Sequence, residues 1–329
     1  MRYTNRLSNR LLAFERPKLA FLCAPGMQNF LDDIVRHFEV DYEVCTCFDG
    51  SNKTLNEVVA WADIIWVEWA NELAVALTRG LPLMANKRVI CRLHSYEAFA
   101  PSLQQIKWER IDDLIFVAPH IRDYTLQQLP GLDQKVKRIQ VVPNGIDLKR
   151  FAPIDRKPGK NLAFLGYINY KKGPMLLLHA FAELHRQDPS YRLFLGGTFQ
   201  DDRYKLYFQQ MVREMDLGDR VVFDGWIDDV PAWLADKHYI VSTSVLEAHP
   251  VGIMEAMACG VKPIVHNFVG AQNIFDSSHL WNSIGEFVAM VRSRDYDSRA
   301  YRAFIETNYS LERQLSSLDQ IMVEAEVLV

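Results

Sequence analysis

The chain has 329 residues, 49% of them hydrophobic and 24% charged, which is the composition of a globular protein and enough length for two domains of about 150 residues each. Its formal net charge of −4 gives no reason to expect a nucleic acid as a partner. Five cysteines, an odd number placed mostly in apolar runs, exclude a complete disulfide framework and favour reduced thiols in a cytoplasmic protein.

The first 18 residues, MRYTNRLSNRLLAFERPK, are basic with leucines interspersed. They lack the long apolar stretch of a secretory signal, and no run in the chain approaches the roughly 20 apolar residues that span a bilayer. Two interpretations stay open for this segment. We favour an N-terminal extension that is disordered or packed on the protein, and the alternative is a peripheral contact with an anionic inner membrane surface.

Short apolar runs alternate with segments of helical length through the first half of the chain. The strands that this pattern predicts are KLAFLCAPG (18–26), DYEVCTCF (41–48), ADIIWVEW (62–69), KRVICRLH (87–94), DDLIFVAP (112–119) and KRIQVVPN (137–144). Because strands separated by helical segments form βαβ units, we expect one doubly wound parallel layer up to about residue 150.

A polar segment, PIDRKPGKN (153–161), then interrupts the alternation and predicts a domain boundary. The second half resumes with strands predicted at 161–166, 191–197, 220–225, 239–244 and 261–266, and helices at 172–187, 202–216, 229–236 and 251–259. The final thirty residues are predicted to be helical. Two parallel sheets imply a cleft, and ligands of such sheets bind beyond the carboxyl ends of the strands.

The segment SVLEAHPVGIMEAMACG (244–260) contains two glutamates at one of these strand ends. Glu247 lies in the loop after a predicted strand, and Glu255 lies about one turn into the following helix. Carboxylates accept hydrogen bonds from paired hydroxyls, so both suit the vicinal diols of a sugar or a ribose. The alternative is that Glu255 only complements the helix dipole.

The start of this helix is a predicted anion site. The N–H groups around Val251, Gly252 and Ile253 lack carbonyl partners within the helix. A diphosphate held there, with a diol on either side, describes a nucleotide-sugar. Lys172, just past another strand end, is a point charge suited to phosphate, and a solvated lysine is the alternative. Gly26 follows the first strand and either lets backbone approach the ligand or forms an ordinary turn.

Polar residues also follow strands of the first domain. His94 in RLHSYEAF stands at a carboxyl end, where a cleft is expected, although a buried and satisfied histidine is the usual alternative. Glu97 either holds an acceptor hydroxyl or caps a helix. Glu68 in WVEWAN suits a sugar face, but a core position is the simpler explanation. His120 begins a predicted helix and is assigned to the cleft.

From residue 138 to 275 the chain resembles glycosyltransferase family 4, retaining enzymes of the GT-B fold. The resemblance rests on the glutamate pair in EAHPVGIME, the succeeding AMACGVKPIV, and three upstream segments. These are VVPNGIDLKRFAP (141–153), LAFLGYINYKKGPMLLLHAFAEL (162–184) and RVVFDGWIDDVPAWLADKHYIVSTS (220–244). The last of them resembles the segment beside the nucleobase. The first domain shows little similarity.

The resemblance implies two Rossmann-like domains facing each other across a cleft. An acceptor-side domain would cover 1–152, a nucleotide-sugar domain 153–295, and a helix at 296–329 would cross back onto the first domain. Glu255 would then bind the ribose hydroxyls, Glu247 the transferred sugar, and Lys172 the diphosphate. The family often has a histidine in the loop of His94, near the reacting face of the sugar.

One position departs from the family. An arginine commonly follows the glycine of the first strand in the second domain, and here Tyr167 follows Gly166. A tyrosine carries no charge at neutral pH, so the diphosphate would lose one cation unless Lys171 or Arg203 replaces it. Because of this departure, one alternative is a nucleotide-sugar-binding subunit that is catalytically weak.

Together these features predict a retaining glycosyltransferase that moves a hexose-type sugar from a nucleotide-diphosphate sugar to an acceptor hydroxyl. No metal or other cofactor is expected, because the only DxD sequence, Asp295-Tyr296-Asp297, lies in a late polar segment. The acceptor stays open among a polysaccharide glycan, a lipid-linked glycan and a small molecule. A GT-B sugar-nucleotide epimerase is a second alternative, and a dehydrogenase is disfavoured because the GxGxxG fingerprint is absent.

Overall fold

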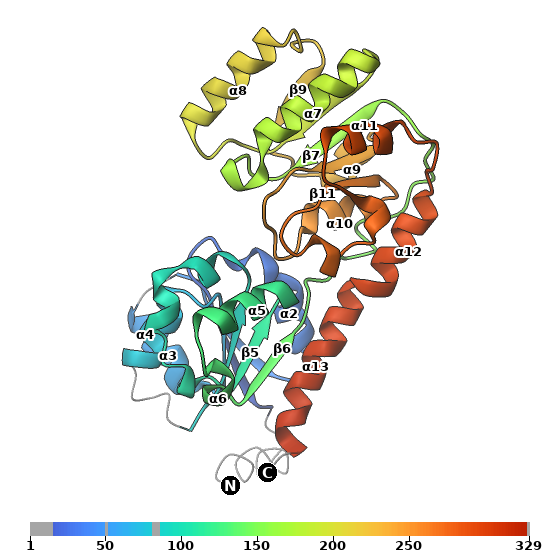
Figure 1. The fold of residues 1–329 in the computed structure, drawn as a ribbon. Helices are drawn as coiled ribbons and strands as arrows, with labels where there is room; N and C mark the ends of the chain where they lie inside the picture. Colours follow the sequence, from blue (N-terminus) through green and yellow to red (C-terminus); the bar gives the residue numbers. More distant parts are fainter. Residues whose placement is uncertain (1–15, 50–51, 81–85, 328–329) are drawn as a thin grey trace. The chain divides into compact units, whose positions relative to one another are not determined.

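The computed structural model describes residues 16–49, 52–80 and 86–327. Residues 1–15 of the basic segment for which a membrane contact was considered therefore lie outside the described residues. The described residues form two compact units, each built on its own six-stranded parallel sheet (Figure 1). The first unit runs to Asn144 and resumes at Gln314, and the second comprises Gly145–Arg313.

The sheet of the first unit has the order β2-β1-β3-β4-β5-β6. Its strands are β1 (Lys18–Leu22), β2 (Glu43–Cys47), β3 (Ile64–Glu68), β4 (Arg88–Leu93), β5 (Asp113–Phe116) and β6 (Arg138–Val141). Its helices are α2 (Asp32–Phe38), α3 (Asn52–Trp61), α4 (Glu72–Gly80), α5 (Pro119–Gln128) and α6 (Leu132–Lys135), joined by most of α13 (Leu311–Val327). Each of the six strands predicted here contains an observed strand, so the predicted doubly wound layer is confirmed.

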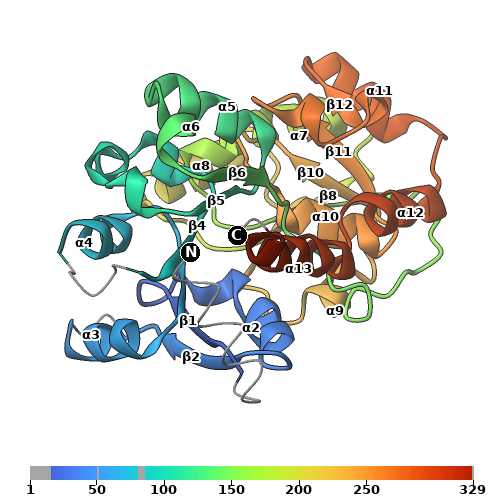
Figure 2. The same cartoon turned by 90° about the horizontal axis from the view of Figure 1, so that it is seen from below.

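The central strands of this sheet are apolar without alternation because helices cover both of its faces. Helices α3 and α4 lie on one face, and α2 and α13 lie on the other (Figures 1 and 2). Helix α13 contributes Leu318, Ile321 and Met322, whose spacing of three and four residues puts them on one buried stripe. A hydrogen bond of 2.7 Å between His37 Nε2 and Asp319 Oδ1 joins α13 to α2.

The second sheet has the order β12-β11-β10-β7-β8-β9. Its strands are β7 (Asn161–Leu165), β8 (Arg192–Gly196), β9 (Val221–Gly225), β10 (Tyr239–Ser242), β11 (Lys262–His266) and β12 (Leu280–Trp281). Its helices are α7 (Pro174–Gln187), α8 (Asp202–Glu214), α9 (Val230–Leu234), α10 (Val251–Ala258), α11 (Ile284–Arg292) and α12 (Ser298–Asn308). The five predicted strands and four predicted helices are confirmed, whereas β12 and α11 were not predicted.

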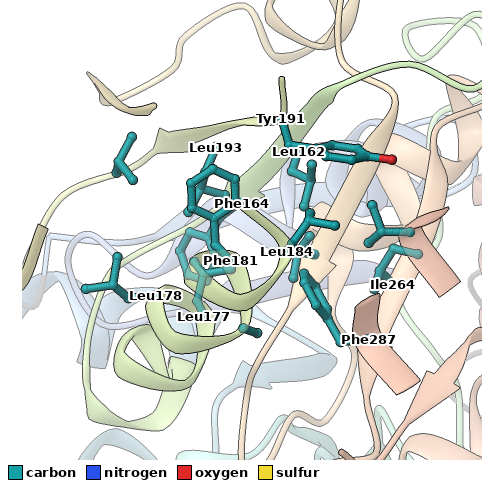
Figure 3. Packing of buried hydrophobic residues seen from close by; sticks show 14 of the residues in the cluster. Leu162, Phe164, Leu177, Leu178, Phe181, Leu184, Tyr191, Leu193, Ile264 and Phe287 are labelled. Carbon is teal, nitrogen blue, oxygen red and sulfur yellow. The ribbon is translucent and has the colours of Figure 1, made fainter. Parts of the chain in front are cut away.

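Two apolar clusters hold the second sheet between its helices. On one face, Phe164 and Leu193 of the strands pack against Leu177 and Phe181 of α7, and Phe287 of α11 closes the cluster (Figure 3). On the other face, buried residues of α10 and α12 form the second cluster. Each burial of a large apolar side chain contributes about 1.5–3 kcal/mol, so these layers hold the loops at the strand ends on a rigid base.

The prediction of a single C-terminal helix is wrong. Helix α12 ends at Asn308 and α13 begins at Leu311, because the intervening backbone pairs with the segment around Ile146. The N–H of Ile146 donates to the carbonyl of Tyr309, and the N–H of Leu311 donates to the carbonyl of Ile146. These bonds replace the helical bonds that a continuous helix would make.

Candidate functional site

The loop between β10 and α10 carries Glu247. Its carboxylate is 8% exposed and lies 2.6 Å from Lys172 Nζ, measured to Oε1. The hydroxyl of Ser244 donates to the same oxygen at 2.7 Å, and Lys171 Nζ lies 3.7 Å from Oε2. Burial by itself would raise the pKa of Glu247, but the two lysines lower it below its usual value, so the carboxylate is ionised at neutral pH.

Lys172 is held against the same loop by its backbone. The side chain of Asn169 accepts a hydrogen bond of 3.2 Å from the N–H of Lys172. The hydroxyl of Thr243 donates to the carbonyl of Lys172 at 2.8 Å. Gly173 follows with a φ of 58°, and a Cβ there would stand 2.1 Å from the carbonyl oxygen of Thr243. Only glycine permits this approach, which brings the loops after β7 and β10 together.

The Lys172 side chain is 23% exposed, whereas its partner Glu247 is almost fully covered. An ammonium has three hydrogens, and the bond to Glu247 uses one of them. The two others can donate to an anionic ligand at the carboxyl edge of the sheet. Lys172 and Glu247 therefore lie side by side in the second unit.

Glu255 lies in α10 and is partly buried. Burial raises the pKa of its carboxyl to about 7, and the positive charge of Arg150 opposes that shift. The side chain is therefore about half ionised at neutral pH. A ligand that binds beside Glu255 can therefore change the charge of its carboxyl group.

The start of α10 differs in detail from the expectation. The N–H of Val251 donates to the carbonyl of His249 at 2.9 Å, and that of Ile253 donates to Pro250 at 3.0 Å. Of the three amides assigned to the anion site, that of Gly252 alone has no hydrogen bond within the described part of the chain. The expectation that Val251 and Ile253 also offer free N–H groups is wrong, because turn hydrogen bonds form at this end of the helix.

Tyr167 follows Gly166 at the end of β7 and is 47% exposed. Its ring lies 5.2 Å from that of Trp226, measured between centroids, and Trp226 is 55% exposed just past the end of β9. Of the two cations considered as replacements for the missing arginine, Lys171 lies beside Glu247. The guanidinium of Arg203 instead forms an ion pair of 2.6 Å with Asp201 at the start of α8.

In the first unit, His94 and Glu68 come together at the ends of adjacent strands β3 and β4. His94 Nε2 lies 2.6 Å from Glu68 Oε1, and Arg92 Nη1 donates to the same oxygen at 3.1 Å. Trp66 Nε1 donates to Glu68 Oε2 at 2.8 Å. Burial would raise the pKa of Glu68, but Arg92 and His94 together lower it.

The roles first considered for Glu68 and Glu97 as direct ligands of an acceptor do not fit their positions. Neither side chain has exposed surface. Both oxygens of Glu68 are occupied within the protein, and the Glu97 carboxylate accepts from the N–H groups of Ala70, His94 and Ser95 at 2.9–3.3 Å. These bonds hold the loop after β4 in place, whereas the structural role considered for Glu97 from the sequence was that of a helix cap.

The two remaining candidates of the first unit lie at strand ends as expected. Gly26 follows β1, has a φ of 77° and is exposed, with no atom within 4 Å of a Cβ placed there. His120 is the second residue of α5 and is partly buried. Neither position by itself assigns a chemical role.

The described residues contain no group of three or more His, Cys, Asp or Glu side chains arranged to hold a metal ion. The DxD sequence serves the fold instead. The Asp297 side chain accepts from the N–H groups of Arg299 and Ala300 and so caps α12, while the carbonyl of Asp295 accepts from Lys262 Nζ at 2.6 Å. Among the same residues, no helix combines the length and the hydrophobicity needed to cross a membrane.

Sequence reasoning missed four residues of these clusters: Arg92, Asn144, Arg150 and Ser244. Arg92 lies inside a strand, where a charged residue in an otherwise apolar run was the available signal. The side-chain oxygen of Asn144, shortly after β6, accepts from Arg92 Nη2. Ser244 and Arg150 carry no signal of their own, because only the fold brings them beside Glu247 and Glu255.

The architecture defines a class. Solved structures with a similar fold include the Anabaena protein Alr3699/HepE in complex with UDP and glucose, with a TM-score of 0.78 and 17% identity over 94% of this chain and 100% of that one. Sucrose-phosphate synthase from Thermosynechococcus elongatus has a TM-score of 0.73 and 16% identity over 95% of this chain and 100% of that one. The chain therefore has the GT-B fold.

The sequence comparisons match part of the chain to a known family. Residues 146–286 match the family model described as glycosyl transferases group 1. One relative belongs to the phosphatidylinositol N-acetylglucosaminyltransferase of Arabidopsis thaliana, and it is 28% identical over 53% of this chain and 40% of that protein. Another is the UDP-Gal:alpha-D-GlcNAc-diphosphoundecaprenol alpha-1,3-galactosyltransferase of Escherichia coli. It is 28% identical over 48% of this chain and 46% of that protein. Over residues 146–286 the chain therefore matches the glycosyl transferases group 1 family, in agreement with the resemblance.

The chain spans less than half the length of these two relatives.

Proposed function

We propose that this protein is a glycosyltransferase that moves a hexose-type sugar from a nucleotide-diphosphate sugar to an acceptor hydroxyl, with retention of configuration and without a metal. The observation that carries the proposal is the ion pair between Lys172 and Glu247, 2.6 Å long, on two loops that Gly173 locks together. It puts a partly exposed cation and a carboxylate side by side at the carboxyl edge of a parallel sheet, where ligands of this architecture bind.

In this proposal the second unit holds the nucleotide-sugar. Lys172 donates to the diphosphate and offsets the charge that develops on it as the sugar leaves. The unbonded N–H of Gly252 donates to the same group at the start of α10. Glu247, kept ionised by Lys172, accepts from hydroxyls of the transferred sugar, and Glu255 accepts from the ribose diol.

The exposed pair of Tyr167 and Trp226 supports a position for the nucleobase at the ends of β7 and β9. Aromatic faces stack on planar bases, and a contribution of about 1–3 kcal/mol per stacked base is typical. The Escherichia coli relative is named for a UDP-sugar, and the Anabaena structure holds UDP. We therefore propose a uridine nucleotide as the first to test.

Retention without a protein nucleophile is the proposed chemistry. The Glu247 carboxylate is bound by two lysines and a serine, which lowers its reactivity as a nucleophile. In the proposed step the acceptor oxygen forms its bond to the anomeric carbon on the face from which the diphosphate leaves. The acceptor's proton passes to the leaving diphosphate, whose negative charge Lys172 partly compensates.

Independence of metal is proposed on the chemistry of the residues present. Lys172 and Lys171 supply positive charge where the diphosphate would lie, and the only DxD sequence caps a helix. The test is turnover with and without a chelator such as EDTA. Equal rates support the proposal, and a loss of turnover that Mg²⁺ or Mn²⁺ restores contradicts it.

The test of the activity itself begins with a thermal-shift screen of the full chain against UDP-, GDP- and ADP-sugars, since a ligand that binds only the folded state raises its stability. A stabilising nucleotide-sugar is then incubated with candidate acceptor glycans, and the product's anomeric configuration is read by NMR. An inverted product contradicts retention. A changed sugar in the absence of any acceptor instead supports an epimerase.

Tyr167 favours a second candidate, a nucleotide-sugar-binding subunit with little activity of its own. A neutral side chain at the arginine position leaves the diphosphate with less compensating charge. Stabilisation by a nucleotide-sugar without turnover for any acceptor would support this candidate over the transferase.

A further inference from the structure

The first unit contains a histidine that is held on several sides. His94 follows β4, and its side chain is only 5% exposed. Its ring Nε2 lies 2.6 Å from Glu68 Oε1, and the ring stacks on that of Trp69 with centroids 3.9 Å apart. The backbone N–H of His94 donates to the carboxylate of Glu97. A histidine that only fills space needs none of these polar contacts.

The bond to Glu68 decides where the ring carries its proton. An ionised carboxylate can only accept hydrogen bonds, so His94 Nε2 must carry a hydrogen to make this contact. Glu68 is itself held by Arg92 Nη1 at 3.1 Å and Trp66 Nε1 at 2.8 Å, and no part of it is exposed. It therefore has no freedom to turn away from the ring.

Trp69 fixes the plane of the ring. It has a φ of 73°, a left-handed conformation that is costly for a bulky residue. Two hydrogen bonds hold it there: its backbone N–H donates to the carbonyl of Arg92 at 2.9 Å, and its indole Nε1 donates to the carbonyl of Met27 at 2.9 Å. Strain held in this way beside a polar group is typical of a functional site.

The second ring nitrogen, Nδ1, has no hydrogen-bond partner among the described residues. In the neutral ring with hydrogen on Nε2, Nδ1 is an acceptor. We propose that Glu68 is a positioning residue, which with Trp69 fixes His94 in the tautomer protonated on Nε2 so that Nδ1 accepts a hydrogen bond from a hydroxyl of the acceptor. The substrate class rests on the proposed function, whereas the tautomer does not.

The direct test is the tautomer of His94 in the full chain labelled with ¹⁵N-histidine. Its signals are assigned by their loss in His94→Gln, and ring ¹H–¹⁵N couplings are recorded above the pH at which the ring becomes neutral. We expect the hydrogen on Nε2 alone. A hydrogen on Nδ1, or a rapid exchange between both nitrogens, overturns the proposal.

Two matched variants separate the role of Glu68 from the effect of removing a buried charge. Glu68→Gln can donate as well as accept, so a mixture of the two tautomers is expected. Glu97→Gln changes an equally buried glutamate that bonds only to backbone amides and leaves the tautomer as in the wild type. A folded Glu68→Gln protein with the wild-type tautomer overturns the proposal. If Glu68→Gln does not fold, the tautomer measured by NMR in the wild-type protein is by itself the test of the proposal.

Kinetics supply a second readout. Glu68→Gln is expected to lower kcat/KM for the acceptor by about tenfold, which is the size expected for the loss of one oriented hydrogen bond to that substrate. The Kd of the nucleotide-sugar, measured separately, is expected to change less than about twofold because its proposed ligands lie in the second unit. Absence of any turnover in the wild type would count against the glycosyltransferase proposal, and the tautomer measurement would still test Glu68.

Discussion

Glu247 in the second unit and Glu68 in the first are both buried glutamates at the ends of parallel strands, and each has a cationic partner. They differ in where that cation stands. Lys172 is 23% exposed and its ammonium keeps donors for a ligand, whereas Arg92 has no exposed surface and bonds only inside the protein. The first arrangement leaves its cation available to a ligand. The second arrangement leaves no cation available to a ligand. Glu68 can therefore affect a ligand only through its neighbour His94.

The difference follows from the chemistry of the two cations. A lysine has a flexible stem and three rotatable donors, so it can bond a carboxylate and a phosphate at once. An arginine presents a rigid fork, which suits a fixed network such as the one that joins Glu68 to Asn144. A pair of a glutamate and a cation therefore leaves donors at the surface in one unit and forms an internal network in the other.

The largest effect is expected from breaking the internal network. Arg92→Leu leaves Glu68 buried without its guanidinium, and we expect the free energy of unfolding of the first unit to fall by about 3–5 kcal/mol. Hydrogen exchange of the backbone amides of β4 measures this. The matched variant is Lys172→Leu, for which a loss of about 1–2 kcal/mol in the second unit is expected because Lys171 and solvent remain near Glu247. Equal losses of unfolding free energy in the two variants would contradict the distinction between an internal and a partly exposed cation.

The next effect concerns turnover. Lys172→Ala removes the cation proposed to offset charge on the leaving diphosphate, and we expect kcat to fall by about 10²–10³-fold. The neighbouring Lys171→Ala is the matched control, with a fall of about tenfold or less because its Nζ lies 3.7 Å from Glu247. Release of nucleoside diphosphate measures both rates. Undiminished turnover in folded Lys172→Ala would contradict the assigned role.

A pH dependence is expected from Glu255. Burial raises its pKa to about 7, and a ribose diol donates to the ionised form. The affinity for a nucleotide-sugar should therefore fall by up to about tenfold per pH unit below that pKa. The phosphates of such a ligand do not titrate in this range, so calorimetry between pH 5.5 and pH 8 isolates the protein group. In Glu255→Gln this dependence should disappear, and a dependence that persists there would assign it elsewhere.

The same pKa has a consequence for stability, with a definite sign. Because the folded-state pKa of Glu255 lies above the ordinary value of 4.5, the folded state binds more protons than the unfolded one between these two values. This group's contribution to stability is fully present below pH 4.5 and is lost as the pH rises through about 7. The thermal stability of the ligand-free second unit, compared between the wild type and Glu255→Gln, measures it.

The smallest effect is expected at Tyr167. Tyr167→Arg places a guanidinium at the end of β7, and we expect the affinity for a nucleotide-sugar to rise by about threefold to tenfold through charge-assisted bonds to the diphosphate. The gain should shrink at high salt. Tyr170→Arg, at an even more exposed position in the following turn, is the control for added charge alone. A loss of affinity in Tyr167→Arg would instead support a stacking role for Tyr167 with Trp226.

Local patterns were enough to predict most of the fold. The apolar runs that became β1 to β11 were recognisable because a parallel sheet covered on both faces needs continuous hydrophobic strands. Strand β12, with two residues, was too short to leave such a pattern. The break between α12 and α13 was also missed, because a pairing with the distant Ile146 competes with helix propensity there.

The sequence by itself determined the two layers, the strand-end positions of Lys172, Glu247 and His94, and the resemblance to a family. These depend on periodicity and on spacing within a few tens of residues. The tertiary structure alone decided which strand ends meet, and so which charges pair: Lys172 with Glu247, and Glu68 with Arg92 and His94. The reason is physical, since burial and pairing set the charge and the hydrogen-bonding role of a side chain, and both arise from residues that are remote in the chain.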